Sequence, residues 1–239
     1  KCRVMNVFGS LAVAGMLVAG NAGGAGAEGV SGDISPIALS GDVRHIVGGG
    51  DIRLRSADPA LRHLINVSGQ GQLAVSIPDG SSMAVGNAGG IYLRDYSDYD
   101  QYVSAFHVAG SGSSGSFAGT GAFSMVGGGK LLGVCAFLSE GKGTLALSGD
   151  IAGEAEAVMN GSNGYASFAA AASGGNLFFG GDRTILRAKA STGNNANGAF
   201  VKYGGMIGFS SKSVLIESRN TDSNSVGINC ADGTVKTSA

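Results

Sequence analysis

Downstream of Glu28, apolar and polar residues alternate in short runs, and each run is bounded by Gly, Asn, Asp or Ser. A period of two residues is typical of a β-strand that buries one face and exposes the other. Near residue 187, for example, Arg187 and Lys189 would lie on one face of a strand, and Leu186 and Ala188 on the other. The pattern predicts strands over residues 43–47, 51–55, 72–77, 101–109, 130–138, 143–147, 151–159, 183–190, 200–209 and 212–219.

This half-buried alternation favours an all-β fold of antiparallel sheets, sandwich-like or stacked, connected by Gly-rich turns. A helical turn is predicted only at residues 58–64, where Asp58 would cap it and Pro59 would occupy its first position. Residues 169–172 are all Ala, but Gly174 and Gly175 follow so closely that a strand or loop is favoured. Residues 110–116 could be a linker that subdivides the domain or a long hairpin loop.

Short fragments recur along the chain. Ser-Gly-Asp begins at residues 31, 40 and 148, and Gly-Gly-Asp begins at 49 and 180. Their spacing follows no fixed period, which argues against a repeat architecture.

Residues 1–27 have the layout of a secretory signal that precedes a β-rich domain at 28–239. Lys1 and Arg3 are followed by an apolar stretch over 4–19, and residues 25–27 (Ala-Gly-Ala) form a cleavage pattern. The alternative is a retained hydrophobic helix that anchors the chain or packs in a filament core. Both interpretations place the protein outside the cytoplasm, with membrane contact only if residues 4–19 are retained.

The chain has few charges and much glycine. Net charge is −1, charged residues make up 14%, and Gly supplies 44 of 239 residues, against about 7% in an average protein. A nearly neutral surface disfavours nucleic acid as a partner and favours association. Each Gly held in a strand costs roughly 0.5–1 kcal/mol relative to Ala, so burial between copies of the chain would offset part of that cost.

Cysteine usage agrees with export. Cleavage after Ala27 would remove Cys2 and leave Cys135 and Cys230, which could form a disulfide in an oxidising compartment. The alternative is two buried free thiols. No Cys-x-x-Cys pair suggests a zinc or redox site.

No motif indicates an enzyme or a cofactor. Residues 110–115 match G-x-G-x-x-G, but the Gly-rich sequence that follows is a poor helix, so a dinucleotide site is rejected. His45, His63 and His107 are isolated in the sequence. We therefore expect no catalytic residue.

The segment around residue 98 is the best candidate binding site. Calcium could bind the oxygens of Asp95, Asp98 and Asp100, while Tyr96, Tyr99 and Tyr102 could stack on glycans or on a neighbouring subunit. A solvated loop would explain the same composition. Asn66 and Asn160 begin glycosylation sequons, of a kind that chance produces in a chain rich in Ser and Asn.

In composition and layout the chain resembles self-assembling envelope proteins: surface-layer, sheath and surface-filament subunits, including the tubular sheaths of methanogenic archaea. The resemblance covers the whole chain and rests on no specific motif. It implies a β-rich structural subunit whose partners are copies of itself. Alternative functions are a secreted adhesin module that binds glycans and an outer-membrane β-barrel.

Overall fold

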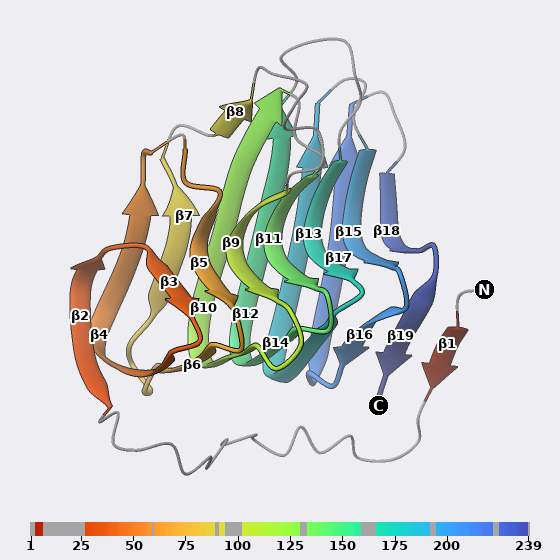
Figure 1. The fold of residues 1–239 in the computed structure, drawn as a ribbon. Coiled ribbons are helices and arrows are strands. Elements are labelled where there is room, and N and C mark those ends of the chain that lie inside the picture. Colours follow the sequence, from red (N-terminus) through yellow and green to blue (C-terminus); the bar gives the residue numbers. More distant parts are fainter. Residues whose placement is uncertain are drawn as a thin grey trace.

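The computed structural model describes residues 3–6, 27–58, 60–88, 91–93, 102–129, 133–158, 166–191, 195–221 and 225–238. These residues form strands and turns, and no helix occurs among them (Figure 1). The chain is all-β, as the alternating pattern predicts.

The strands form two sheets. The larger, sheet A, contains twelve strands: β1 (Arg3–Asn6), β2 (Glu28–Ile34), β4 (Val43–Ser56), β6 (Gln72–Ser76), β7 (Met83–Asn87), β8 (Ile91–Leu93), β10 (Ser114–Gly129), β12 (Thr144–Val158), β14 (Asn176–Ala190), β16 (Gly205–Phe209), β17 (Ser213–Asn220) and β19 (Gly233–Thr237). Sheet B contains seven: β3 (Ile37–Ser40), β5 (His63–Ser68), β9 (Tyr102–Ala109), β11 (Gly133–Glu140), β13 (Ala166–Ser173), β15 (Asn195–Lys202) and β18 (Ser225–Cys230).

The chain alternates between the two sheets and advances by one strand at each circuit, which makes it a β-solenoid (Figure 1). Every pairing between named strands is parallel. Thr144, for example, pairs with Ser114, thirty residues earlier, and with Asn176, thirty-two residues later. One circuit, called a coil below, contributes one strand to sheet B, and seven coils are complete in this sense.

The predicted antiparallel sandwich is therefore wrong. In a solenoid each parallel strand has one face on the core and one face outward, so it shows the alternation that antiparallel sheets also show. The Gly-rich turns that were interpreted as hairpins are corners, where the chain passes from one sheet to the other. The corner at Gly141 donates its N–H to the carbonyl of Ser173 in the next coil, so hydrogen bonding continues through the corners.

Several predicted elements also change. Segments 43–47 and 51–55 are parts of one strand, β4, and residues 144–147 and 151–158 of the next two predicted segments belong to one strand, β12. The predicted helix at 58–64 is absent, and Asp58 instead accepts a hydrogen bond from the N–H of Ala60 in a turn. The four alanines at 169–172 lie in strand β13. Residues 110–113 form a corner between β9 and β10, and the hydrophobic core is continuous past it.

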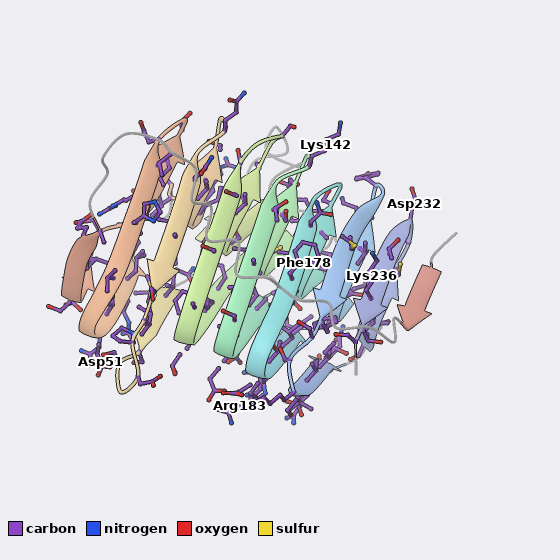
Figure 2. All side chains as sticks on the ribbon, turned by 90° about the horizontal axis from the view of Figure 1, so that it is seen from below. Asp51, Lys142, Phe178, Arg183, Asp232 and Lys236 are labelled. Carbon is purple, nitrogen blue, oxygen red and sulfur yellow. The ribbon has the colours of Figure 1, made fainter. Side chains whose placement is uncertain are left out.

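The long strands of sheet A bend in the middle, and the bend divides each of them into two limbs. In β12 the first limb is residues 144–148 and the second limb is 150–158. In other coils the limbs are separate strands, such as β16 and β17. Figure 2 shows the first limbs from below, with Lys142 and Asp232 at one edge and Asp51 and Arg183 at the opposite edge.

Glycines stack at the bend. Gly119, Gly149 and Gly181 occupy successive coils with φ values of 122°, 109° and 91°, a region that favours glycine. A Cβ on Gly149 would lie 2.2 Å from the carbonyl oxygen of Gly119. The coils approach so closely here that no side chain fits, and this explains the Gly-Asp fragments at 149 and 181.

Phenylalanine rings fill the core between the two sheets. Ring centroids are 5.0 Å apart for Phe123 and Phe137, 5.5 Å for Phe137 and Phe179, and 5.4 Å for Phe179 and Phe209. The first three of these side chains are at most 1% exposed, and Phe209 is 4% exposed. The aromatic series runs along the solenoid axis, so each coil is held by the coils on both sides of it.

Candidate functional site

The solenoid is open at its last complete coil. There, β17 pairs only with β14 and β18 pairs only with β15, so no described strand pairs with the outer edge of either. Unpaired strand edges present backbone donors and acceptors that can bind another strand.

Side chains that belong to the core are exposed at this end. Ile228 continues the inward row of Phe137, Ala170 and Ala199, which are fully buried, yet it is 43% exposed. Val214 continues the row of buried Thr184 and is 40% exposed. The rows of inward-facing core side chains are therefore exposed to solvent at this end of the solenoid.

The other end of the solenoid is formed by β2 and β3, which are the last strands of sheets A and B on that side. Val30 and Ile34 of β2 are only partly buried against the core. Strand β2 pairs with β4 from Ile46 onward, so no described strand pairs with residues 43–45 of β4 on that side. The ion pair of Glu28 with Arg44, at 2.9 Å, lies at this step.

On the outer face of sheet B, side chains of the sheet cover one another. Outward-facing side chains form two rows along the sheet, one on each side of the middle of its strands, and the two rows contact each other. His63 stacks on His107 with ring centroids 4.0 Å apart, and Phe168 stacks on Phe200 at 4.6 Å. Asn229 donates a hydrogen bond to Asn197 at 3.0 Å. We call this line of contacts the outer seam. It buries Cys135 and Leu138 completely.

A polar network occupies one end of the outer seam. Nδ1 of His63 lies 2.9 Å from the hydroxyl of Ser104, and Nδ1 of His107 lies 2.9 Å from Oδ1 of Asn66. Nε2 of His107 is 3.2 Å from a carboxylate oxygen of Glu140. Because Ser104 is completely buried, its hydroxyl cannot meet a substrate, and the network serves to hold the seam together.

Burial governs the protonation of His63. It lowers the pKa of His63 from 6.5 to about 3, with smaller contributions from the charges of His107 and Arg62. The folded chain therefore keeps His63 neutral, whereas the unfolded chain binds a proton below about pH 6.5.

We predict that the free energy of unfolding falls as the pH drops from 6.5 towards 3, by up to about 1.4 kcal/mol per pH unit from His63 alone. The unfolded state binds the extra proton in this window, so acid favours unfolding. Urea unfolding at several pH values, for the wild type and His63→Gln, measures the effect. The His63→Gln variant should show a flatter pH dependence, and His45→Gln serves as a control on another His. Equal pH dependence in the wild type and His63→Gln would contradict the prediction.

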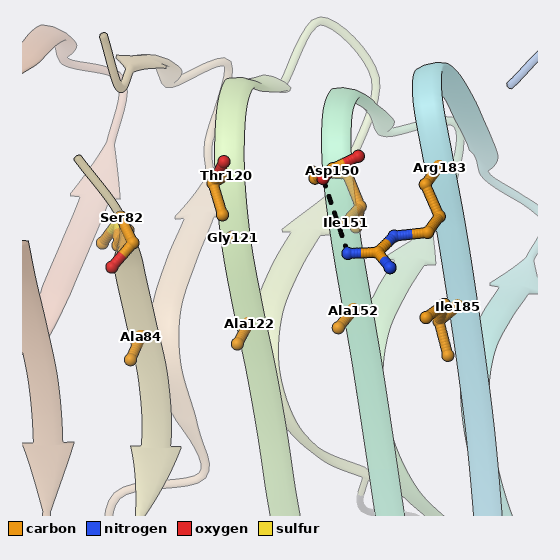
Figure 3. Close-up of a pocket in the computed structure, with 11 residues that line it drawn as sticks. Ser82, Ala84, Thr120, Gly121, Ala122, Asp150, Ile151, Ala152, Arg183 and Ile185 are labelled. Carbon is orange, nitrogen blue, oxygen red and sulfur yellow. Dashed lines mark hydrogen bonds and ion pairs between the residues drawn. The ribbon is translucent and has the colours of Figure 1, made fainter. Parts of the chain in front are cut away.

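The outer face of the second limbs is flat and carries charges that pair between coils. Arg187 contacts Glu217 at 2.7 Å, Arg183 contacts Asp150 at 3.5 Å, and Lys189 pairs with Glu154. A shallow hollow of about 160 Å³ lies beside Arg183 (Figure 3), over a floor that includes Ala84, Ala122, Ala152 and Ile185. It is smaller than the roughly 300–1,000 Å³ of typical ligand pockets, and no aromatic side chain lines it for sugar stacking.

Most residues of the predicted binding segment lie outside the described residues: Asp95, Asp98, Asp100, Tyr96 and Tyr99. Tyr102 begins β9 and is 8% exposed, and its hydroxyl accepts a hydrogen bond from Lys202 at 2.7 Å. It packs in the apolar cluster of the outer seam, where a glycan could not stack on it. Among described residues, no group of three His, Cys, Asp or Glu side chains could hold a metal ion.

The sequons also differ in placement. Asn66 lies in β5, half-buried, with its side chain engaged by His107. Asn160 lies outside the described residues.

The predicted disulfide between Cys135 and Cys230 is not formed. Cys135 is a completely buried free thiol, and burial raises its pKa, which keeps it unreactive. Cys230 is disulfide-bonded. The two residues cannot meet because Cys135 lies in an outward row of sheet B, whereas Cys230 packs against the main core.

At the amino terminus, residues 3–6 form strand β1, which pairs with β19. Of the predicted signal or helix, residues 1–2 and 7–26 lie outside the described residues. Across the described parts of the chain, no helix has the length and apolarity to span a membrane.

The chain matches no family model, no curated protein and no solved structure. The β-solenoid fold is compatible with a structural or surface protein, and the argument for function rests on the surfaces described above.

Proposed function

We propose that the protein is an exported structural protein that assembles head to tail into a filament or sheath at the cell surface. The observation that carries this proposal is the end of the core at β17 and β18, where Ile228 is 43% and Val214 is 40% exposed. In a self-contained domain these positions would be covered.

A second copy can supply the missing cover. With β3 of the next copy against β18, in the register of the existing coils, Ile37 would follow Ile228. In the same arrangement β2 of that copy lies against β17, and Ile34 follows Ile216, which is also only partly buried. Both core rows then continue with apolar residues.

The symmetry of this contact implies a polymer. Two different ends of the chain meet, so each added copy leaves a new free end, and such a contact generates filaments unless the rotation closes a ring. The near-neutral charge of −1 offers little repulsion between copies. Export is supported by the bonded state of Cys230, since disulfides persist in oxidising compartments.

Ile228→Lys tests the contact. We expect the wild type to associate as its concentration rises and the variant to remain monomeric, because a Lys at this position would bury an unpaired charge in the contact. Sedimentation velocity over a hundredfold range of concentration measures association, and negative-stain microscopy shows its form.

A matched control places the same charge elsewhere. Ser124→Lys adds a Lys to the exposed outer face of β10, in the middle of the solenoid. It should associate like the wild type. A wild type that stays monomeric at every concentration would refute the proposed function.

A further inference from the structure

The corners at which the chain leaves sheet B form a ridge along one side of the solenoid, called the corner ridge below. Each corner is hydrogen-bonded to the next. Lys142 donates its backbone N–H to the carbonyl of Gly174 at 2.7 Å, and Gly174 donates to the carbonyl of Lys202 at 3.0 Å. Figure 2 shows Lys142 and Asp232 at this edge. Because the corner ridge runs along the side, it stays exposed when copies join through their ends.

One corner carries tyrosine at a position where other coils carry glycine. Five of the seven strands of sheet B are followed directly by a glycine with positive φ: Gly41, Gly69, Gly110, Gly141 and Gly174. Strand β15 is followed instead by Tyr203, with a φ of 53°. A bulky side chain rarely adopts this conformation, and strain of this kind is found mainly at functional sites. The tyrosine therefore costs stability at this corner, which indicates a role for its ring outside folding.

The ring of Tyr203 is exposed, and it is held from one side. The residue is 72% exposed, and the ammonium group of Lys202 lies 4.6 Å from the centre of its ring. The same ammonium group donates a hydrogen bond to the hydroxyl of Tyr102, which is part of the outer seam. The cation attracts one face of the ring and leaves the other face open to solvent. A flat ring held in this way is a surface on which another ring can stack.

The ridge position beside Tyr203 has no side chain. A Cβ on Gly174 would lie 3.9 Å from the Cβ of Tyr203 and 3.8 Å from the backbone nitrogen of Gly141, so Gly174 lies between these two corners. The corners of Lys142 and Tyr203 are two strand spacings apart, about 9.6 Å. Lys142 is exposed, and its ammonium group has no ion-pair partner in the described parts of the chain. An aromatic face and a cation thus flank a glycine.

The acidic groups nearby indicate the direction in which an anionic ligand would lie. Glu140 precedes the corner of Lys142, and its carboxylate is engaged by His107 at 3.2 Å. Asp232 is exposed at the next corner beyond Tyr203. A negative charge on a ligand is therefore favoured on the side of Tyr203 that faces Lys142 and disfavoured on the side that faces Asp232.

We propose that this part of the corner ridge binds an acidic glycan. A sugar ring stacks on the open face of Tyr203, and the carboxylate of a uronic acid pairs with the ammonium group of Lys142. The C–H groups on one face of a sugar pack on an aromatic ring, and the pair of Lys with carboxylate is a charge-assisted hydrogen bond. An exposed ridge suits a polymer that lies across it, whereas small molecules bind in enclosed pockets. The site does not depend on the contact between copies.

Isothermal titration of the full-length chain with a short oligomer of galacturonic acid tests the site. Tyr203→Gly removes the ring and supplies the residue type of the other corners, and Lys142→Gln removes the charge. Lys212→Gln is the matched control, because Lys212 is 82% exposed and lies between β16 and β17, outside the corner ridge. The methyl ester of the same oligomer is the control ligand, since it keeps the sugar rings and lacks the negative charge.

We expect Tyr203→Gly to bind the oligomer roughly tenfold more weakly than the wild type. Its midpoint of urea unfolding should be no lower, because glycine relieves the strain at this corner. Lys142→Gln should bind roughly threefold more weakly. Lys212→Gln should bind like the wild type, and the methyl ester should bind more weakly than the acid.

Three results would overturn the proposal. The first is that the wild type does not bind the oligomer, or binds it no better than Tyr203→Gly does. The second is that the methyl ester binds as tightly as the acid, which would exclude the pairing with Lys142. The third is that Tyr203→Gly weakens association between copies in sedimentation while binding of the oligomer is unchanged, which would make the corner ridge a contact between copies.

Discussion

Gly149→Ala is expected to lower the free energy of unfolding by roughly 2–6 kcal/mol. Two costs add. A side chain at φ 109° imposes backbone strain of about 1–3 kcal/mol. The new Cβ would also lie 2.2 Å from the carbonyl oxygen of Gly119, and forced repacking costs about 1–3 kcal/mol more. Equilibrium urea unfolding measures the loss.

Two other glycines separate these costs. Gly80 has a φ of 81°, and no atom lies within 4 Å of the Cβ that Ala would add, so Gly80→Ala costs backbone strain alone. Gly29 has neither a positive φ nor a neighbour within 4 Å, so Gly29→Ala should be nearly neutral. The expected order of destabilisation is Gly149, then Gly80, then Gly29. If Gly149→Ala were no worse than Gly80→Ala, the close stacking of coils at the bend would be refuted.

Phe137→Ala is expected to cost about 3–5 kcal/mol, the usual loss for deleting a buried aromatic side chain. The ring is fully buried, with neighbours at 5.0 Å (Phe123) and 5.5 Å (Phe179). It also lies over Gly153, where a Cβ would approach it to 2.4 Å, so the surroundings are shaped to this ring. The same unfolding measurement applies.

Phe178→Ala provides the contrast. Phe178 lies on the outer face of the first limb and is only half-buried, so its removal should cost markedly less (Figure 2). Equal losses for the two variants would contradict the assignment of inward and outward rows in this part of the solenoid.

The strands and the faces that they bury were predictable because a period of two residues is typical of any half-buried strand, whether its neighbour runs parallel or antiparallel to it. In β12 the alternation of Ile151, Ala155 and Ala157 with charged Glu154 and Glu156 correctly identifies inward and outward faces. It could not identify the direction of the neighbouring strand, so the parallel solenoid was missed. The strand β10 was missed for another reason: its glycines lower strand propensity, yet Gly121 is required because a Cβ there would lie 2.7 Å from the ring of Phe117.

A repeat signal was present in the corners. Gly69, Gly141, Gly174 and Gly204 all have positive φ and stand where a strand of sheet B ends. Along the sequence, these glycines are separated by roughly one coil or a small multiple of it. The Ser-Gly-Asp fragments, in contrast, occur both at corners and at bends. Ser40-Gly41-Asp42 is a corner, but Ser148-Gly149-Asp150 is a bend. Because these fragments occupy two kinds of position, their spacing does not show the length of one coil.

The candidate surfaces were less predictable than the fold. Val214 and Ile228 have the local sequence of ordinary buried strands, and only the topology places them at an open end. The outer seam likewise depends on contacts between rows, such as His63 with His107, that are 44 residues apart in the sequence. Polar and aromatic composition instead drew attention to Tyr102, which is buried.

The central claim is that copies continue the solenoid end to end, and cryo-electron microscopy of the assembled protein tests it most directly. Strands lie about 4.8 Å apart along the axis, and each copy contributes seven strands to sheet B. The account predicts a filament with a continuous strand repeat and a subunit repeat of about 34 Å along its axis, seven times the strand spacing. Copies joined side by side through the second-limb face, or strands running along the filament axis, would contradict it.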